Sequence, residues 1–174
     1  SPSPILLLCR LTMDTAPMLL TAALAAFLAL GGFLYRPLNW LFLLPGTLAH
    51  ELSHWLVAFV TGSRPGFPSL FPHRMDCGNW ALGSVSFAPG WLTAGFVALA
   101  PAYLLPLLGI VLYGYGSGQS VPVQGGVGYV LGVLAWSWWP SRTDFRIAAR
   151  YPVGTLVLLG ILSLIAIGVW NRLE

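Results

Sequence analysis

Charged residues are so sparse in this chain that long stretches of it fit the interior of a lipid bilayer. Residues 77–141 contain no aspartate, glutamate, lysine or arginine. Over all 174 residues only 7% are charged and 57% are apolar. Soluble domains carry roughly 25% charged residues, so this composition predicts an integral membrane protein.

The few charges separate apolar stretches that are long enough for membrane helices. The predicted spans are residues 15–35, 38–62, 91–113, 121–139 and 152–170. Pro45-Gly46 predicts a kink in the second span, and Pro101 and Pro106 should bend or open the third. We therefore expect an all-α membrane protein, a bundle of about five helices, folded as a single domain over residues 1–174.

Two smaller patterns add detail to this bundle. In the loop 63–90, residues 80–87 partly alternate between apolar and polar side chains and are followed by Pro89-Gly90. This predicts a short β-strand or hairpin at the membrane surface. Gly128 and Gly132 lie four apart in the fourth span, which indicates either close packing of two helices or the ordinary glycine content of membrane helices.

The arginines predict the orientation of the chain. All eight basic residues are arginine. A five-span arrangement places six of them on one side and two on the other, the six being Arg10, Arg64, Arg74, Arg142, Arg146 and Arg150. The positive-inside rule makes that side cytoplasmic, with the N-terminus inside and the C-terminus outside. Such loop arginines, which raise the pI to about 9.2, favour a lipid bilayer as partner and no nucleic acid.

The cysteines and the first residues say little about function. Cys9 and Cys77 are too few for a disulfide framework, and the predicted topology places both on the reducing side. Residues 5–8 are too short for the core of a signal peptide. Ser1 is not a methionine, and the sequence leaves open whether Met13 lies near the natural start.

The second predicted span carries the run His50-Glu51-Leu52-Ser53-His54, which has the pattern H-E-x-x-H. Glu51 is the only formally charged residue between Pro37 and Ser63, and a carboxylate at the bilayer centre costs roughly 2.5–3.5 kcal/mol. Two histidines four apart share one helix face and can bind one metal ion. Glu51 could then take a proton from a metal-bound water. The alternative is a helix with two buried, hydrogen-bonded histidines and a paired glutamate.

A catalytic zinc needs a third protein ligand and an open position for water. The candidates in this chain are Asp76, Asp144, His73 and Cys77. Asp144 follows the fourth span. However, Ser141 with Asp144 three residues later also matches a capping box that would start a short interfacial helix over 142–150. Spacing alone leaves both roles of Asp144 open.

Taken together, these motifs resemble the site-2 proteases, which are intramembrane zinc metalloproteases, and most closely their small bacterial and archaeal members. The resemblance covers about residues 38–146. It rests on the histidine run, the strand-like segment, Ala100-Pro101-Ala102-Tyr103, and Pro-Ser-x-x-Asp at 140–144. The chain departs from larger members because its aspartate is not in an Asn/Leu-x-Asp-Gly setting and because it has no room for a PDZ insertion.

The resemblance implies one zinc per chain, bound by His50, His54 and Asp144, with Glu51 as the general base. It also implies a multi-pass protein of a prokaryotic cell membrane that cleaves membrane-protein or membrane-associated peptide substrates. The strand near 80–87 would lie beside the site and pair with an unwound substrate segment. Asn79 and Ser141 are the candidate donors to the transition state.

Two other functions are compatible with the sequence. One is a membrane zinc-binding or assembly protein without proteolysis, in which His73 or Cys77 would supply a fourth ligand. The other is a small proton-coupled transporter that uses Glu51 and Asp144 as a relay.

Overall fold

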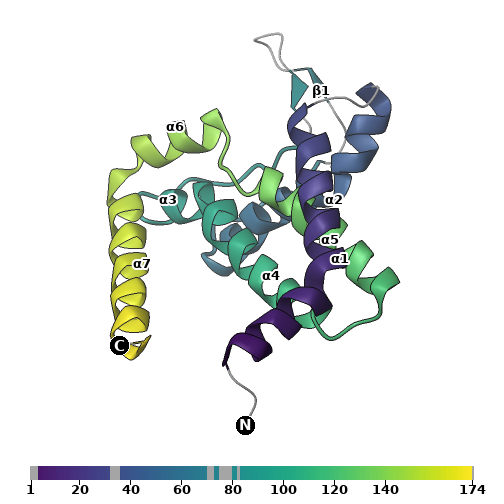
Figure 1. Cartoon of the computed structure of the whole chain (residues 1–174). Helices are drawn as coiled ribbons and strands as arrows, with labels where there is room; N and C mark the ends of the chain where they lie inside the picture. The colour runs from purple at the N-terminus through teal and green to yellow at the C-terminus, as the bar shows by residue number, and fades with distance from the viewer. Residues whose placement is uncertain (1–3, 32–35, 70–72, 75–79, 82, 174) are drawn as a thin grey trace. The chain divides into compact units, whose positions relative to one another are not determined.

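The computed structural model describes residues 4–31, 36–69, 73–74, 80–81 and 83–173, and most of them are helical (Figure 1). The helices are α1 (Pro4–Gly31), α2 (Arg36–Val60), α3 (Thr93–Ala98), α4 (Ala100–Gly116), α5 (Val121–Ser137), α6 (Arg142–Arg150) and α7 (Pro152–Leu173). The strands are β1 (His73–Arg74) and β2 (Trp80–Ala81). The predicted all-α class is confirmed for the described part of the chain.

Each predicted span has a helical counterpart, and two of these counterparts differ in detail from a single helix with the predicted limits. α1 begins at Pro4, well before residue 15, and continues through Pro17. The third predicted span consists of two helices, because α3 ends at Ala98 and α4 begins at Ala100. This break precedes Pro101, which has no N–H to continue the helical ladder.

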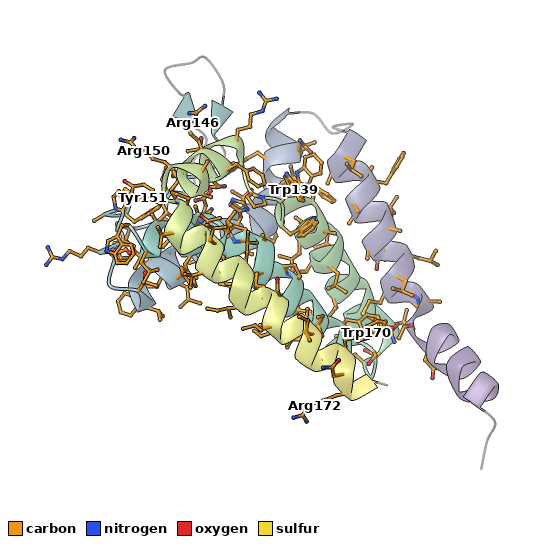
Figure 2. All side chains as sticks on the ribbon, turned by 90° about the vertical axis from the view of Figure 1, so that its left-hand side faces the viewer. Trp139, Arg146, Arg150, Tyr151, Trp170 and Arg172 are labelled. Carbon is orange, nitrogen blue, oxygen red and sulfur yellow. The ribbon has the colours of Figure 1, made fainter. Side chains whose placement is uncertain are left out.

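Two helices in the described part of the chain are long and apolar enough to cross a membrane. They are Asp14–Gly31 within α1 and Pro152–Arg172 within α7. α4 and α5 are apolar but have only 17 residues each. Figure 2 shows Trp170 and Arg172 at one end of α7, and Tyr151 with Arg146 and Arg150 of α6 at the other. This pattern supports membrane association, while the five-span arrangement remains a prediction.

Contacts divide the chain into two compact units, and the prediction of a single domain remains untested. The first unit comprises Ser1–His50 and Tyr103–Trp138, and the second comprises Glu51–Ala102 and Trp139–Glu174. In the first unit α1 packs along α5. Gly128 lies against the backbone of Met18, and Gly132 lies against the backbone of Ala22. The close-packing interpretation of the two glycines is therefore confirmed.

In the second unit α3 packs on both α6 and α7, and a hairpin follows α2. β1 and β2 pair antiparallel, with His73 opposite Ala81 and Arg74 opposite Trp80. The pairing continues through a bridge between Ser69 and Ser84. Along 83–88, half-buried and exposed residues alternate. The extended segment predicted near 80–87 is thus present.

Candidate metal centre

Three side chains that could hold a metal ion come together beside the second half of α2. They are His50, His54 and Asp144, and one potential ligand atom of each lies within 4.8 Å of the other two. His50 and His54 belong to the same continuous helix, so α2 itself fixes their spacing. Asp144 comes from the first turn of α6, where its Oδ1 lies 3.5 Å from Nε2 of His54. His54 is buried and the other two residues are half-buried.

A backbone carbonyl orients each imidazole. Nδ1 of His50 lies 2.6 Å from the carbonyl oxygen of Ser137, and Nδ1 of His54 lies 2.7 Å from that of Val97. A carbonyl oxygen only accepts hydrogen bonds, so Nδ1 must be the donor in both pairs. Metal-binding histidines are typically held by such a bond from the second ring nitrogen. In a neutral ring this leaves the lone pair on Nε2, the nitrogen that could bind a metal.

Both carbonyls are accessible because a regular helical hydrogen bond is missing. The carbonyl of Val97 would ordinarily accept from the N–H of residue 101, but that residue is proline. Ser137 is the last residue of α5, and the final carbonyls of a helix have no partner within it. Pro140 follows shortly afterwards and disfavours continuation of the helix. The chain thus provides an acceptor for each histidine from the end of another helix.

The donor set fits a cation. The neutral imidazole of His54 would direct a lone pair at the carboxylate oxygen of Asp144 over 3.5 Å. Two acceptors at this distance repel each other unless a proton or a metal ion lies between them. Nitrogen and oxygen ligands of a tetrahedral zinc, each bound at roughly 2.1 Å, are about 3.4 Å apart. The separation of these two atoms is therefore compatible with shared coordination.

Asp144 caps α6 and faces His54 at the same time. Its Oδ2 accepts a hydrogen bond from the backbone N–H of Ser141 at 2.6 Å, and the hydroxyl of Ser141 accepts from the backbone N–H of Asp144. These bonds form the capping box that the sequence predicted. Oδ1 is the oxygen directed at His54. The capping box therefore does not exclude a metal-binding role for Asp144, because the two roles would use different oxygens.

Glu51 is buried next to the hairpin segment. Only 8% of its surface is exposed. A Cβ atom added at Gly83 would lie 2.7 Å from Cγ of Glu51 and 2.9 Å from its Oε1. Glycine at position 83 therefore lets the extended segment run directly over the glutamate. Glu51 also lies three residues from His54, which makes the two neighbours on the helix surface.

The remaining predicted residues contribute less to this site. Asp76, Cys77 and Asn79 lie outside the described residues. His73 belongs to β1, for which the structure gives the backbone pairing. The hydroxyl of Ser141 is a hydrogen-bond acceptor in the cap of α6. The sequence analysis did not identify the carbonyls of Val97 and Ser137 or the contact of Gly83 with Glu51. The only sequence signals for the two carbonyls are Pro101 and Pro140, which interrupt regular helical hydrogen bonding nearby.

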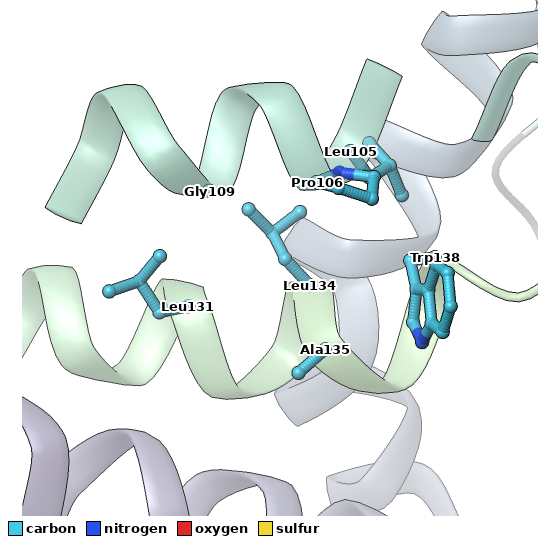
Figure 3. A pocket seen from close by; sticks show the side chains of 7 residues that line it. All are labelled: Leu105, Pro106, Gly109, Leu131, Leu134, Ala135 and Trp138. Carbon is cyan, nitrogen blue, oxygen red and sulfur yellow. The ribbon is translucent and has the colours of Figure 1, made fainter. Parts of the chain in front are cut away.

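A separate apolar cavity lies in the first unit between α4 and α5 (Figure 3). Its volume is about 390 Å³. It is lined by Leu105, Pro106 and Gly109 of α4 and by Leu131, Leu134, Ala135 and Trp138 of α5. Because no titratable side chain lines it, this cavity offers neither a metal ligand nor an acid or base.

The histidine–aspartate cluster, with a buried glutamate on the same helix, is thus the candidate site for chemistry. Comparisons of the chain with protein-family models, with curated proteins and with solved structures gave no match.

Proposed function

We propose that this protein is an intramembrane zinc metalloprotease that resembles the site-2 proteases and hydrolyses peptide bonds of membrane-protein substrates. The observation that carries the proposal is the orientation of the two histidines. Both Nδ1 atoms are bonded to carbonyls, and Nε2 of His54 faces Oδ1 of Asp144. Two imidazole nitrogens and one carboxylate form the donor set of a catalytic zinc site that keeps a position open for water.

In this proposal each residue has a distinct role. His50, His54 and Asp144 would hold the ion, which when bound lowers the pKa of a water molecule and polarises the scissile carbonyl. Glu51 accepts the proton of the attacking water and later donates it to the leaving amine. The burial of Glu51 keeps bulk water from competing for that proton. The carbonyls of Val97 and Ser137 hold the imidazole rings in position.

The extended segment 83–88 provides a place for the substrate. Its residues Ser84, Ser86 and Ala88 form backbone hydrogen bonds with the segment 63–69. Backbone groups of alternate residues point to opposite edges of a strand, so Val85 and Phe87 direct theirs to the other edge. An unwound substrate could pair there as an added strand, with its peptide bonds exposed to attack. Because Gly83 touches Glu51, such a substrate would run past the proposed base.

Metal content and cleavage, measured on the same preparation, test the proposal. Purified protein is expected to contain about one zinc per chain and, in proteoliposomes, to cleave a single-span test peptide with a central Asn-Pro sequence. A chelator should stop cleavage and added zinc should restore it. Zinc binding without cleavage of a library of such peptides would instead indicate the zinc-binding or assembly protein. A preparation that binds no zinc but moves protons would indicate the transporter.

The variant Glu51→Gln separates catalysis from metal binding. The amide keeps the size of the side chain but cannot accept the proton of water. We expect zinc content to stay at the wild-type level, while the cleavage rate falls roughly 100- to 10,000-fold. Glu51→Asp is the matched control, since it retains a base at a shorter reach and should keep some activity. Loss of zinc from Glu51→Gln would show that Glu51 is a ligand.

A further inference from the structure

The nine-residue helix α6 carries a row of arginines on one side. Arg142, Arg146 and Arg150 lie four residues apart, which places them along one face of the helix, and all three are exposed. The opposite side contains the buried Ala148 and the half-buried Asp144 and is turned toward the protein. We call the three residues the arginine row.

No acidic partner neutralises the arginine row among the residues that the structure describes. The carboxylate of Asp144, the only acidic group on α6, is directed at Ser141 and His54. Within the described part of the chain, α6 therefore presents three positive charges without an acidic partner on one exposed surface. A partner complementary to the arginine row would carry several negative charges on a surface next to α6.

The second unit places this row where lipid headgroups would lie. α7 follows directly after α6 and is one of the helices long and apolar enough to cross a membrane. Figure 1 shows α6 running across the end of α7, as an interfacial helix lies on a bilayer. Tyr151 and Trp170 are the aromatic residues near the two ends of α7 (Figure 2). At 1.5 Å per residue they are about 28 Å apart along the helix, which matches the hydrocarbon thickness of roughly 30 Å.

Aromatic side chains next to the arginine row are also of the kind that lies at the level of lipid headgroups. Trp139 and Phe145 are both exposed, and their ring centroids lie 5.8 Å apart. Tryptophan and other aromatic rings are favoured at the level of lipid headgroups, and arginine binds phosphate through its planar fork of donors. The surface thus combines apolar rings that can enter the interface with cations that can bind the phosphates above it.

We infer that the arginine row of α6 is a binding surface for anionic phospholipid headgroups. Negatively charged lipids supply phosphates in the plane on which α6 lies, and each arginine can bind one of them by charge-assisted hydrogen bonds. Because the same helix carries Asp144, lipid bound to the row also holds the helix that positions this proposed metal ligand. The inference rests on the membrane location in the proposed function, and it is independent of the metal chemistry.

Lipid retention measured by native mass spectrometry tests this inference on the full-length protein. Wild-type protein is released from mixed micelles that contain phosphatidylglycerol or phosphatidylcholine, and the bound lipids are counted over a range of lipid concentrations. A basic residue near the surface contributes roughly a fivefold gain in affinity for anionic lipid. The variant Arg146→Gln/Arg150→Gln is therefore expected to bind phosphatidylglycerol about 25-fold more weakly.

Three controls make the result specific. Arg36→Gln/Arg172→Gln removes the same charge elsewhere and should leave binding unchanged, whereas Arg146→Lys/Arg150→Lys should retain most of it. Inorganic phosphate at equal concentration should not displace the lipid. Equal loss in both glutamine variants, equal retention of phosphatidylcholine, or displacement by free phosphate would overturn the inference. Zinc content of the same samples reports separately on the proposed function, since a zinc-free protein can still select anionic lipid.

Discussion

Pro101 affects the candidate metal centre because it has no N–H with which to donate a helical hydrogen bond. Without an N–H at this position, the carbonyl of Val97 receives no regular helical hydrogen bond from residue 101 and lies 2.7 Å from Nδ1 of His54. Pro101→Ala would supply an N–H that competes for this carbonyl. Loss of such an orienting bond typically weakens metal binding 10- to 100-fold. We expect that loss of zinc affinity for Pro101→Ala in chelator competition. Pro106→Ala, inside α4 and away from the histidines in sequence, should stay within about threefold of wild type.

The two oxygens of Asp144 allow its roles to be separated experimentally. Asp144→Asn keeps an acceptor for the backbone N–H of Ser141 but removes the negative charge that faces His54. Zinc affinity should therefore fall at least about 10-fold, while the bundle stays folded. Ser141→Ala removes only the hydroxyl that accepts from the backbone N–H of Asp144. It should lower the free energy of unfolding by about 0.5–2 kcal/mol and leave zinc content near normal. Zinc loss confined to Ser141→Ala would mean that the cap, and not the carboxylate charge, governs the site.

At the scale of helices, the contact between α1 and α5 depends on glycines that leave no space for a side chain. A Cβ at Gly132 would meet the backbone of Ala22 and lie 2.7 Å from Cβ of Ala25. Gly132→Ala should therefore destabilise the protein by about 1–3 kcal/mol through overpacking. Gly126, on the same helix, has no described atom within 4 Å of such a Cβ. Gly126→Ala should be neutral or gain up to about 1 kcal/mol, because alanine is the better helix former. Thermal unfolding in detergent compares the two, and equal melting temperatures would contradict this packing.

The sequence predicted these elements well where one residue type decides the structure. Charged residues mark the ends of the apolar stretches, so the existence of the helices could be anticipated. Pro101 likewise predicted the break in the third stretch. The spacing of Ser141 and Asp144 correctly predicted the capping box of α6. The early start of α1 was missed, because residues 5–8 read as a short apolar run before Arg10 and Asp14. The spacing of His50 and His54 placed them on one face of α2.

Other parts of the site could not be derived from sequence patterns. Asp144 was favoured by resemblance alone, since the approach of α6 to His54 is a tertiary contact that no local spacing encodes. The carbonyls of Val97 and Ser137 belong to the backbone, and the prolines that follow them do not indicate which side chain each carbonyl contacts. The contact of Gly83 with Glu51 likewise depends on the path of the extended segment.

At the scale of the whole molecule, one sequence boundary between the two compact units falls inside the histidine motif. The boundary lies between His50 and Glu51, inside the continuous helix α2. The spacing of the two histidines is therefore a property of one helix. His54, Glu51, Asp144 and the extended segment all belong to the second unit. That unit also contains α6 and α7, so in the predicted membrane arrangement the orientation of α7 would decide on which side of the bilayer α6 lies.

Labelling at the two ends of α7 tests this orientation. Thr143 in α6 and Asn171 near the end of α7 are both exposed, and each can be replaced by cysteine after Cys9 and Cys77 have been changed to serine. The arginine distribution predicts that α6 faces the cytoplasm and the C-terminus faces outside. A membrane-impermeant maleimide should therefore label Asn171→Cys in intact cells but label Thr143→Cys only after permeabilisation. Labelling of both in intact cells would mean that α7 does not cross the membrane. The reverse pattern would place α6, and the arginine row with it, on the outer surface and would invert the predicted topology.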